Sequence, residues 1–388
     1  MKKAELFNDC KNHLGEGVLW SKQQETLYWL DVPMPSRLFK LNMKNNKLSI
    51  FDMPEMITSM SVRSNGDLLI ASHHGINNFN FENKKLEKIL DLEPDLPKNR
   101  CNDGASDAHG RFWIGTMQNN ISPEATDIAL TENSGSLYCI QDDLSFTKHE
   151  ADIGVSNTLA WSPDNTKFYF TDTLTGIIFS YDFDLESGTI SNKKEFAKHD
   201  RGYPDGSTVD SEGYLWSCRW GGSCVVRFNP QGNVDDIIEL PVENITSCTF
   251  GGSNLQTLFI TTARWGMTKE DIEKNPQAGN LFAIDLDIKV IMTMTHSGST
   301  ARMISRYRPQ GKILALTPFK IIARQLQIVW GVMAIKVEKY DNVDVVPNLC
   351  KSVLEEMQLI ESGERFVITG GVPMGVTGTT NYLSVQVR

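Results

Sequence analysis

The feature that most constrains this chain is a pattern repeated six times along its first 287 residues. Each repeat has a polar or glycine lead followed by aromatic and aliphatic residues, and these runs begin at Leu27, Leu68, Phe112, Phe168, Leu215 and Leu258. The spacings are 41, 44, 56, 47 and 43 residues, and a second strand-like run follows each first one. A period of about 40–50 residues with several strands is typical of a β-propeller blade. A two-sheet sandwich is the alternative fold, but sandwiches rarely repeat at this period. The pattern predicts an all-β, six-bladed propeller over residues 1–287.

The sequence changes character near Lys289. Strand-like runs such as 290–294 and 313–316 alternate with helix-like runs, the longest at about 320–330. Other expected elements are helices at 302–307 and 347–360 and strands at 332–337, 366–368 and 382–387. Alternating strands and helices predict a smaller α/β domain with a mainly parallel sheet over residues 288–388.

The charges divide at the same point. The whole chain has 38 Lys and Arg against 48 Asp and Glu, a net charge of −10. The first 287 residues carry 26 − 41 = −15 and the remainder 12 − 7 = +5. The acidic part would repel nucleic-acid phosphates and anionic lipids, so we expect no nucleic-acid and no membrane partner. Opposite signs indicate two modules with different ligands, although soluble domains also vary by this much.

The cysteines and the N-terminus indicate a compartment. The seven cysteines are odd in number, scattered and without a CxxC pair, which is typical of reduced buried thiols rather than a disulfide framework or a zinc site. The first residues contain no apolar signal core, and no run approaches the roughly 18 apolar residues of a membrane span. We therefore expect a cytoplasmic protein.

Polar residues stand at nearly the same offset before the strand runs of four repeats. Glu16 and Asn157 precede their runs by 11 residues, Asp205 by 10, and Arg100 and Asn102 by 12 and 10. Taken singly, each favours a tight turn, because Asp-Gly and Asn-Asp-Gly adopt turn conformations readily. Equivalent blade positions meet at one mouth of a propeller channel, so the shared offset favours a common site.

The residue types at this site suit a metal ion. Glu16, Asp205 and Asn157 offer two carboxylates and an amide oxygen, with a charge of −2. Hard divalent cations take such oxygen ligands. No histidine stands at these offsets, which disfavours a zinc site built on imidazoles. We predict one divalent metal ion and leave its identity open among calcium, magnesium, manganese and zinc.

Six motifs occur in an order that resembles the senescence-marker-protein/gluconolactonase (regucalcin-like) family over about residues 8–287. They are Leu-Gly-Glu-Gly at 14–17, Asn-Arg-Cys-Asn-Asp-Gly at 99–104, Gly-Arg-Phe-Trp-Ile-Gly-Thr-Met at 110–117, Ser-Asn at 156–157, Pro-Asp-Gly at 204–206 and Thr-Ser-Cys-Thr-Phe-Gly-Gly at 246–252. The resemblance implies a six-bladed propeller that hydrolyses a sugar lactone with a catalytic divalent metal.

The resemblance also implies roles for individual residues. Glu16, Asn157 and Asp205 would bind the metal, which would polarise the lactone carbonyl, and Arg100 and Asn102 would hold substrate hydroxyls. Asp205 would be the catalytic residue that helps to deprotonate the attacking water.

Two departures from the family pattern concern substrate preference. Many relatives have glycine where this chain has Thr158, and an acidic lid residue of some relatives is replaced by Asn119-Asn120. A different class of function stays open: a calcium- or metal-binding propeller that acts as a scaffold without turnover. Assays with lactones separate the two.

The C-terminal segment contains a candidate anion site. Residues 295–302, Thr-His-Ser-Gly-Ser-Thr-Ala-Arg, lie between a predicted strand and a predicted helix. Amides at a helix N-terminus, with hydroxyls and a glycine, can bind a phosphate, so Ser297, Gly298, Ser299 and Thr300 are the candidate residues. An ordinary helix cap is the alternative explanation.

The segment 290–388 also resembles the C-terminal effector domain of pyruvate kinase. The matching motifs are those at 297–302, 305–309 and 330–332, and the glycine-rich pieces at 370–373 and 378–381. The resemblance implies a sugar-phosphate effector and homo-oligomer contacts through the tail. The opening helices of that domain are missing, and no barrel or catalytic motif of the kinase precedes it. We therefore expect no kinase activity, and the tail is either a sensing or oligomerising module or a vestige.

Overall fold

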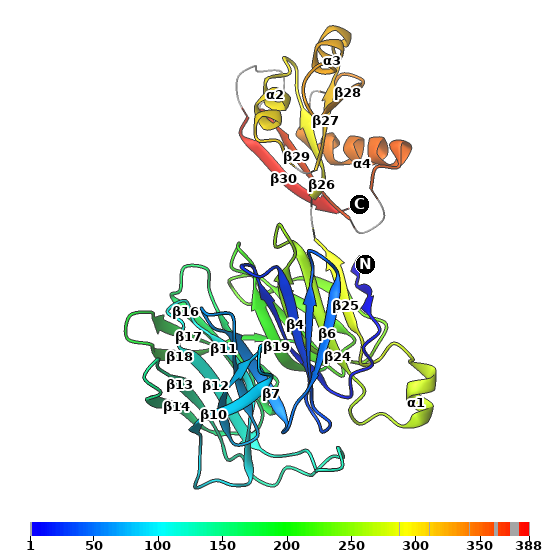
Figure 1. Cartoon of the computed structure of the whole chain (residues 1–388). Helices are drawn as coiled ribbons and strands as arrows, with labels where there is room; N and C mark the ends of the chain where they lie inside the picture. The colour runs from blue at the N-terminus through cyan, green and yellow to red at the C-terminus, as the bar shows by residue number, and fades with distance from the viewer. Residues whose placement is uncertain are drawn as a thin grey trace. The chain divides into compact units, whose positions relative to one another are not determined.

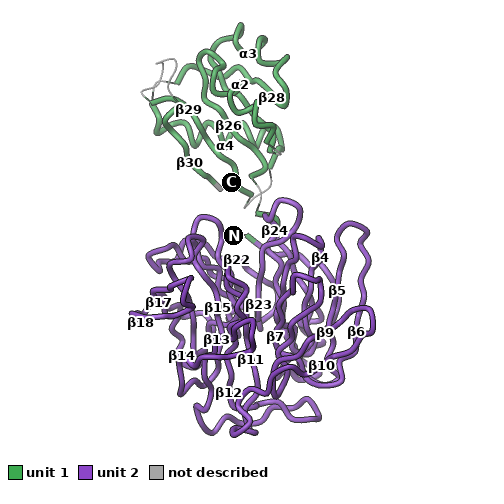
Figure 2. Tube along the Cα trace, turned by 60° about the vertical axis from the view of Figure 1, so that its left-hand side comes forward, with its two compact units in different colours: residues 1–2, 285–388 green, residues 3–284 purple. Residues whose placement is uncertain are grey.

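The computed structural model describes residues 2–286, 288–309, 311–340, 342–360, 364–372 and 380–387. The chain divides into two compact units, residues 3–284 and residues 285–388 with 1–2 (Figure 2). The expected boundary residue Asp287 lies outside the described residues. No helix in the described part of the chain is long and apolar enough to cross a membrane.

The larger unit consists of six sheets, which confirms the predicted six-bladed propeller (Figure 1). Blade 1 has β3 (Gly15–Ser21), β4 (Thr26–Asp31), β5 (Arg37–Asn42) and β6 (Lys47–Asp52). Blade 2 has β7 (Ile57–Val62), β8 (Leu68–Ser72), β9 (Gly75–Asn80) and β10 (Lys85–Asp91). Blade 3 has β11 (Asn99–Ser106), β12 (Phe112–Gln118), β13 (Gly135–Ile140) and β14 (Phe146–Ile153).

The remaining blades follow the same plan with small additions. Blade 4 has β15 (Ser156–Trp161), β16 (Lys167–Asp172), β17 (Ile177–Asp184) and β18 (Thr189–Lys198), with the 3-10 turn η1 (Thr173–Thr175). Blade 5 has β19 (Tyr203–Val209), β20 (Leu215–Trp220), β21 (Cys224–Phe228) and β22 (Val234–Glu239), next to which lies β1 (Lys2–Lys3). Blade 6 has β23 (Asn244–Gly251), β24 (Thr257–Ala263), β25 (Leu281–Asp285) and β2 (Glu5–Asn8).

Blade 6 closes the ring with strands from both ends of the propeller unit. Strand β2 pairs with β25 in antiparallel register, Glu5 opposite Ala283 and Leu6 opposite Phe282 (Figure 1). An early strand therefore completes a sheet whose other three strands come last. The pairing covers the edge of β25 and ties the N-terminal segment to the last blade.

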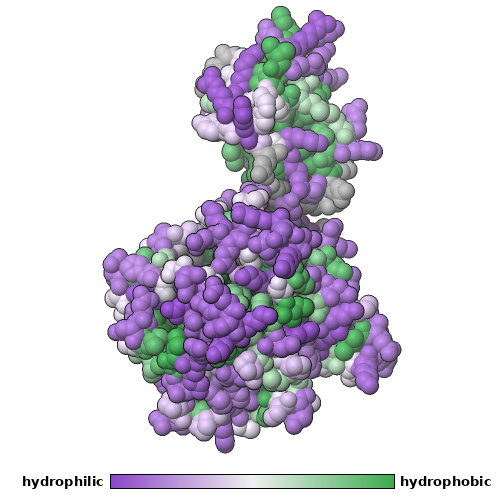
Figure 3. Space-filling model, viewed as in Figure 1, coloured by the Kyte–Doolittle hydropathy of each residue, from purple (hydrophilic) through white to green (hydrophobic). Residues whose placement is uncertain are grey.

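Apolar side chains fill the spaces between neighbouring blades. Tyr28 of blade 1 packs in one cluster with Ile70 of blade 2, and Trp113 of blade 3 packs with Phe168 of blade 4. Each such buried side chain stabilises the fold by about 1.5–3 kcal/mol. On the face that Figure 3 shows, hydrophilic residues dominate the outside of the propeller unit.

Two insertions depart from the regular blade. The connection between β12 and β13 covers residues 119–134 and accounts for the longest repeat spacing. The helix α1 (Lys269–Lys274) lies between β24 and β25, and Thr268 and Asp271 form a reciprocal cap at its start. Both insertions contribute residues to the cavity described below.

The smaller unit is a five-stranded sheet with helices, which confirms the predicted mainly parallel α/β domain. Its strand order is β28-β27-β26-β29-β30, parallel except for β30. The elements are β26 (Ile288–Met294), α2 (Ser299–Arg306), β27 (Lys312–Thr317), α3 (Lys320–Leu326), β28 (Val332–Lys336), η2 (Val343–Val345), α4 (Val346–Met357), β29 (Arg365–Gly370) and β30 (Tyr382–Val387). Val290 and Met292 pack with Cys350 of α4, and Ile313 and Ala315 pack with α2 and α3.

The helix expected at 320–330 is shorter in the structure. Helix α3 ends at Leu326, and two turns follow, in which Val329 donates to Leu326 and Val332 donates to Val329. Gly331 then adopts a φ of 67°, a left-handed conformation that a helix cannot continue through. The sequence pattern missed this end because apolar residues persist to Trp330.

Candidate metal and substrate site

The first strand of every blade carries an irregularity at the same place. Register shifts occur between residues 16 and 19, 57 and 59, 101 and 104, 157 and 160, 204 and 207, and 245 and 248. These first strands lie against one another around the unit. A β-bulge re-aims the side chains beside it, so the repeated bulge turns polar residues towards the shared centre. Because the bulge recurs at the same position of each first strand, the polar residues beside it stand at nearly the same offset in the sequence.

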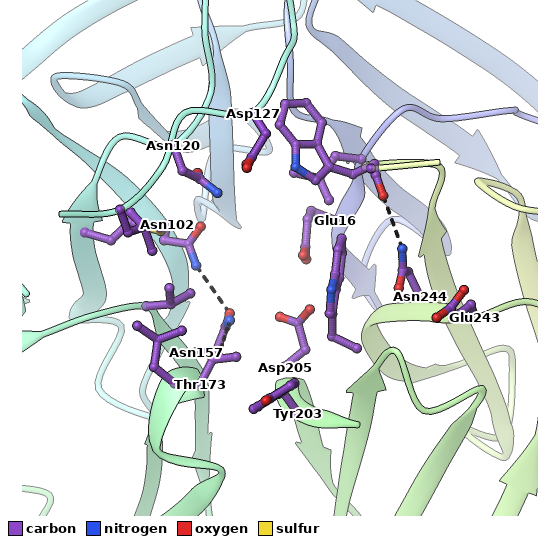
Figure 4. Close-up of a pocket in the computed structure, with 18 of the residues that line it drawn as sticks. Glu16, Asn102, Asn120, Asp127, Asn157, Thr173, Tyr203, Asp205, Glu243 and Asn244 are labelled. Carbon is purple, nitrogen blue, oxygen red and sulfur yellow. Dashed lines mark hydrogen bonds between the residues drawn. The ribbon is translucent and has the colours of Figure 1, made fainter. Parts of the chain in front are cut away.

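All five propeller residues predicted from the sequence line one cavity of about 800 Å³. Glu16 comes from β3, Arg100 and Asn102 from β11, Asn157 from β15 and Asp205 from β19. Figure 4 shows the carboxylates of Glu16 and Asp205 pointing into the same space, with Asn102 and Asn157 across from them. The structure thus brings together residues that are as much as 189 positions apart.

The amide of Asn157 is oriented by Thr173, a residue that the sequence did not indicate. Asn157 Nδ2 donates to Thr173 Oγ1 over 2.9 Å, and that hydroxyl donates to the carbonyl oxygen of Pro204 over 2.8 Å. With its nitrogen bound to Thr173, Asn157 turns its amide oxygen towards Asn102, whose Nδ2 lies 3.4 Å away. The side chain therefore presents an oxygen, the atom that a hard cation binds.

The two carboxylates lie in an environment that disfavours their charges. Burial raises the pKa of Glu16 well above its usual range, and the charges of Asp205 and Asp103 raise it further. Burial and Asp103 likewise raise the pKa of Asp205. Asp205 Oδ1 accepts the Gly206 N–H over 3.1 Å. Carboxylates forced together away from water are stabilised by a bound cation.

Asp103 lies close enough to Glu16 and Asp205 for its charge to raise their pKa values. Its carboxylate accepts backbone N–H groups of Gly104, Thr158 and Leu159, and thereby joins blades 3 and 4. Burial raises the pKa of Asp103 to about 7. Its place in the Asn-Asp-Gly motif was the available signal, but a turn explains that motif equally well, so this role was not predicted.

Thr158 adopts a conformation in which its β-branched side chain is strained. Its φ is 57°, in the left-handed region, and the residue is fully buried. Such a residue costs on the order of 1–3 kcal/mol and persists only where its surroundings hold it. Its hydroxyl donates to the carbonyl oxygen of Asp205 over 2.6 Å and lies 2.9 Å from Ser207 Oγ. The departure from glycine therefore adds a contact that fixes the backbone of Asp205.

Arg100 organises the side of the cavity next to blade 3. Its Nη1 donates to Asn102 Oδ1 over 2.6 Å, and its Nη2 donates to Asn120 Oδ1 over 2.9 Å. Burial lowers the pKa of Arg100 to about 10, so the group stays cationic at neutral pH. Asn120, noted in the sequence as a departure from an acidic residue, thus belongs to the same network.

The donors fit a hard divalent cation. In the part of the chain that the structure describes, no three His, Cys, Asp or Glu side chains form a metal-binding group. A metal bound in this cavity would therefore rely on the two carboxylates of Glu16 and Asp205 and the amide oxygen of Asn157. Oxygen donors of this kind suit calcium, magnesium or manganese better than a cation that prefers sulfur.

The fold and the cavity together define a class: a six-bladed propeller whose first strands bring two carboxylates and amide side chains into one cavity. Residues 14–264 match the SMP-30/Gluconolactonase/LRE-like region, and the chain belongs to this family.

Three relatives illustrate the similarity. Regucalcin of Xenopus laevis is 30% identical over 289 residues, which cover 74% of this chain and 95% of that protein. A putative sugar lactone lactonase, YvrE, of Bacillus subtilis is 32% identical and covers 73% of this chain and 95% of its own length. The crystal structure of regucalcin from Agrobacterium tumefaciens, described as calcium-binding, has a TM-score of 0.68 at 29% identity, covering 73% of this chain and 93% of its own.

The C-terminal unit has a separate relationship. Residues 278–386 match the pyruvate kinase alpha/beta domain. The match begins before β25, although strand pairing places β25 in blade 6. The tail motif at Ser297–Thr300 lies at the start of α2, where Gly298 has a φ of 81° and no side chain caps the helix. Thr300 Oγ1 lies 2.9 Å from Thr380 Oγ1, while Pro373 to Thr379 of the late glycine-rich motif lie outside the described residues.

Proposed function

We propose that this protein is a metal-dependent hydrolase that opens a sugar lactone to the sugar acid. The observation that carries the proposal is the convergence of Glu16, Asn157 and Asp205 in one cavity. Relatives described as a putative sugar lactone lactonase and as a calcium-binding regucalcin support it.

Glu16, Asn157 and Asp205 would hold the divalent cation, whose identity we leave among calcium, magnesium, manganese and zinc. When bound, it supplies Lewis acidity for the lactone carbonyl and compensates the two carboxylates.

The residues of the chain perform the remaining tasks. Asp205 Oδ2 accepts a proton from the attacking water, because Oδ1 already accepts the Gly206 N–H. Arg100, by fixing Asn102 and Asn120, holds their amides in place for the hydroxyl groups of the substrate. Water adds to the carbonyl carbon, the ring C–O bond breaks, and one proton passes to the ring oxygen, which yields one hydroxy acid.

Metal addition tests the proposal directly. Metal-free protein should gain thermal stability with at least one of the four cations, by about 2.7 kcal/mol when free metal is 100 times its Kd. The same cation should switch on acid release from gluconolactone, measured in a pH-stat, and a chelator should reverse both effects. Metal binding without acid release would instead support the scaffold alternative. No thermal shift with any cation would contradict the metal site.

We propose the C-terminal unit as a sugar-phosphate binding and oligomerising module. The uncapped start of α2 beside Ser297, Ser299 and Thr300 supports it. Fructose 1,6-bisphosphate should slow proteolysis of the tail in the full chain. Ser299→Asp should remove this protection, because it places a negative charge in the proposed phosphate site at the start of α2. Ser352→Asp, exposed on α4, is the control. Rapid digestion with and without the ligand would favour a vestigial tail, and sedimentation measures self-association.

We also propose a reducing, cytoplasmic setting, because all seven cysteines are free in the structure.

A further inference from the structure

Four large apolar or aromatic side chains, here called the apolar side, line the cavity among polar ones such as Thr173 and Asn244, and the proposed metal and hydroxyl chemistry does not use them. Leu174 from η1, Tyr203 from β19, Trp220 from β20 and Trp265 after β24 all line the cavity. They come from three consecutive blades, 4, 5 and 6. Tyr203 and Leu174 are 54% and 52% exposed. Exposed apolar side chains gathered at a cavity indicate a surface that a ligand covers.

The fold holds this apolar side in place. Trp265 is 8% exposed and packs with Val32, Met56 and Ile121, and the partly buried Trp220 packs against the same cluster. Ile121 belongs to the 119–134 insertion, so that connection packs against the two tryptophans. The two rings are therefore fixed by a small core, while Leu174 and Tyr203 offer their surfaces to a ligand.

The cavity is large for a single sugar-lactone ring. Its volume of about 800 Å³ lies in the upper part of the range of about 300–1,000 Å³ that holds drug-sized ligands. An aldonolactone bound at Glu16, Asn157 and Asp205 would leave much of this space, including its apolar side, filled with water.

The charge of the cavity argues against an anionic substrate. Among the described residues that line it, Arg100 is the one cation, and the acidic residues are Glu16, Asp127, Asp205, Glu243 and Asp271. Their formal sum is 1 − 5 = −4, which one divalent cation reduces to −2. In Figure 4, Asp127 lies above the Glu16–Asp205 centre and Glu243 lies to its right. A phosphate or carboxylate on the substrate would be repelled by the negative charge of this cavity.

We infer that the substrate of this site is an uncharged sugar lactone that carries an apolar alkyl or aryl substituent. The lactone ring faces Glu16, Asn157 and Asp205, and the substituent lies against Leu174, Tyr203 and the two tryptophans. The inference rests on the proposed lactone hydrolysis and specifies which lactones are used.

Matched substrate pairs test the inference with the metal-loaded full chain. δ-Decalactone differs from δ-valerolactone by a pentyl arm, and 6-phosphogluconolactone differs from gluconolactone by its phosphate. We expect kcat/KM to be at least about tenfold higher for the pentyl lactone, because even one methylene in an apolar pocket has such an effect. We expect it to be at least about tenfold lower for the phosphorylated lactone. Equal values within the pairs, with turnover of gluconolactone, would overturn the inference and leave the hydrolase in place.

A binding measurement separates the two proposals if turnover fails. The corresponding unreactive lactams, with and without the pentyl arm, are titrated against tryptophan fluorescence. Tenfold tighter binding of the pentyl lactam without hydrolysis of any lactone would support the apolar site and overturn the hydrolase. Equal binding of the two lactams would overturn the apolar site.

Variants locate the arm. Tyr203→Ala and Leu174→Ala should each lower the ratio of kcat/KM for the pentyl and unsubstituted lactones about three- to tenfold, since each removes apolar surface from the arm. Ile50→Ala is the matched control, because Ile50 on β6 is 51% exposed and does not line the cavity. An unchanged ratio in both cavity variants would overturn the placement of the arm.

Discussion

Asp205→Asn should lower kcat/KM for lactone hydrolysis by about 10²–10⁴-fold, the range for removing a positioned proton acceptor. Asparagine has nearly the same shape and can still accept the Gly206 N–H. The backbone oxygen of residue 205 keeps its bond from the Thr158 hydroxyl. The substitution therefore removes one negative charge and the proton acceptor while the surrounding structure is retained.

The measurement is acid release in a pH-stat at several concentrations of the activating metal. If Asp205 acted as a metal ligand alone, excess metal would restore the rate, whereas loss of the proton acceptor persists at saturation. Asp142→Asn, a surface aspartate on the turn after β13, is the control and should behave as wild type. If Asp205→Asn kept more than a tenth of wild-type activity at saturating metal, the result would contradict the role of Asp205 as general base.

The sequence repeat predicted the blades and the site for the same physical reason. A blade must bury both faces of its sheet, so aromatic and aliphatic runs such as Leu27-Tyr28-Trp29 recur at the blade period. The first strands all bulge at the same position along the strand. Polar residues at that position therefore recur at nearly the same offset before each buried run. Periodicity thus found Glu16, Asn157 and Asp205 without any knowledge of contacts.

Periodicity could not find features that occur once. The pairing of β2 with β25 joins strands about 275 residues apart, and a single edge pairing leaves no repeated signal. Thr173 and Asn120 act through hydrogen bonds from loops that follow the second strands, outside the common offset. The apolar side of the cavity was hidden too, because Trp220 and Trp265 occur among many buried aromatic residues in the sequence.

Glu16→Gln should stabilise the metal-free protein and destabilise the metal-loaded one. Without metal, the Glu16 carboxylate is desolvated and repelled by Asp205 and Asp103, which raises its pKa. A neutral amide of the same size removes these costs, and we expect a gain of about 1–3 kcal/mol, the scale for a poorly compensated buried polar group. With saturating metal, the variant lacks one ligand charge and should bind the cation more weakly, so it loses the stabilisation that binding gives wild type.

The pH dependence of the free energy of unfolding tests this prediction in a second way. Because the pKa of Glu16 is higher in the folded protein than in the unfolded chain, its contribution is fully present at pH values below the unfolded pKa and is lost as the pH rises through the folded one. As the pH rises above the unfolded pKa of glutamate, metal-free wild type should therefore lose stability more steeply than metal-free Glu16→Gln. Thermal melts of both proteins, with chelator and with the activating metal, measure this. Equal pH slopes, or a metal-free variant less stable than wild type at the upper pH, would show that Glu16 is stabilised by other groups without a cation.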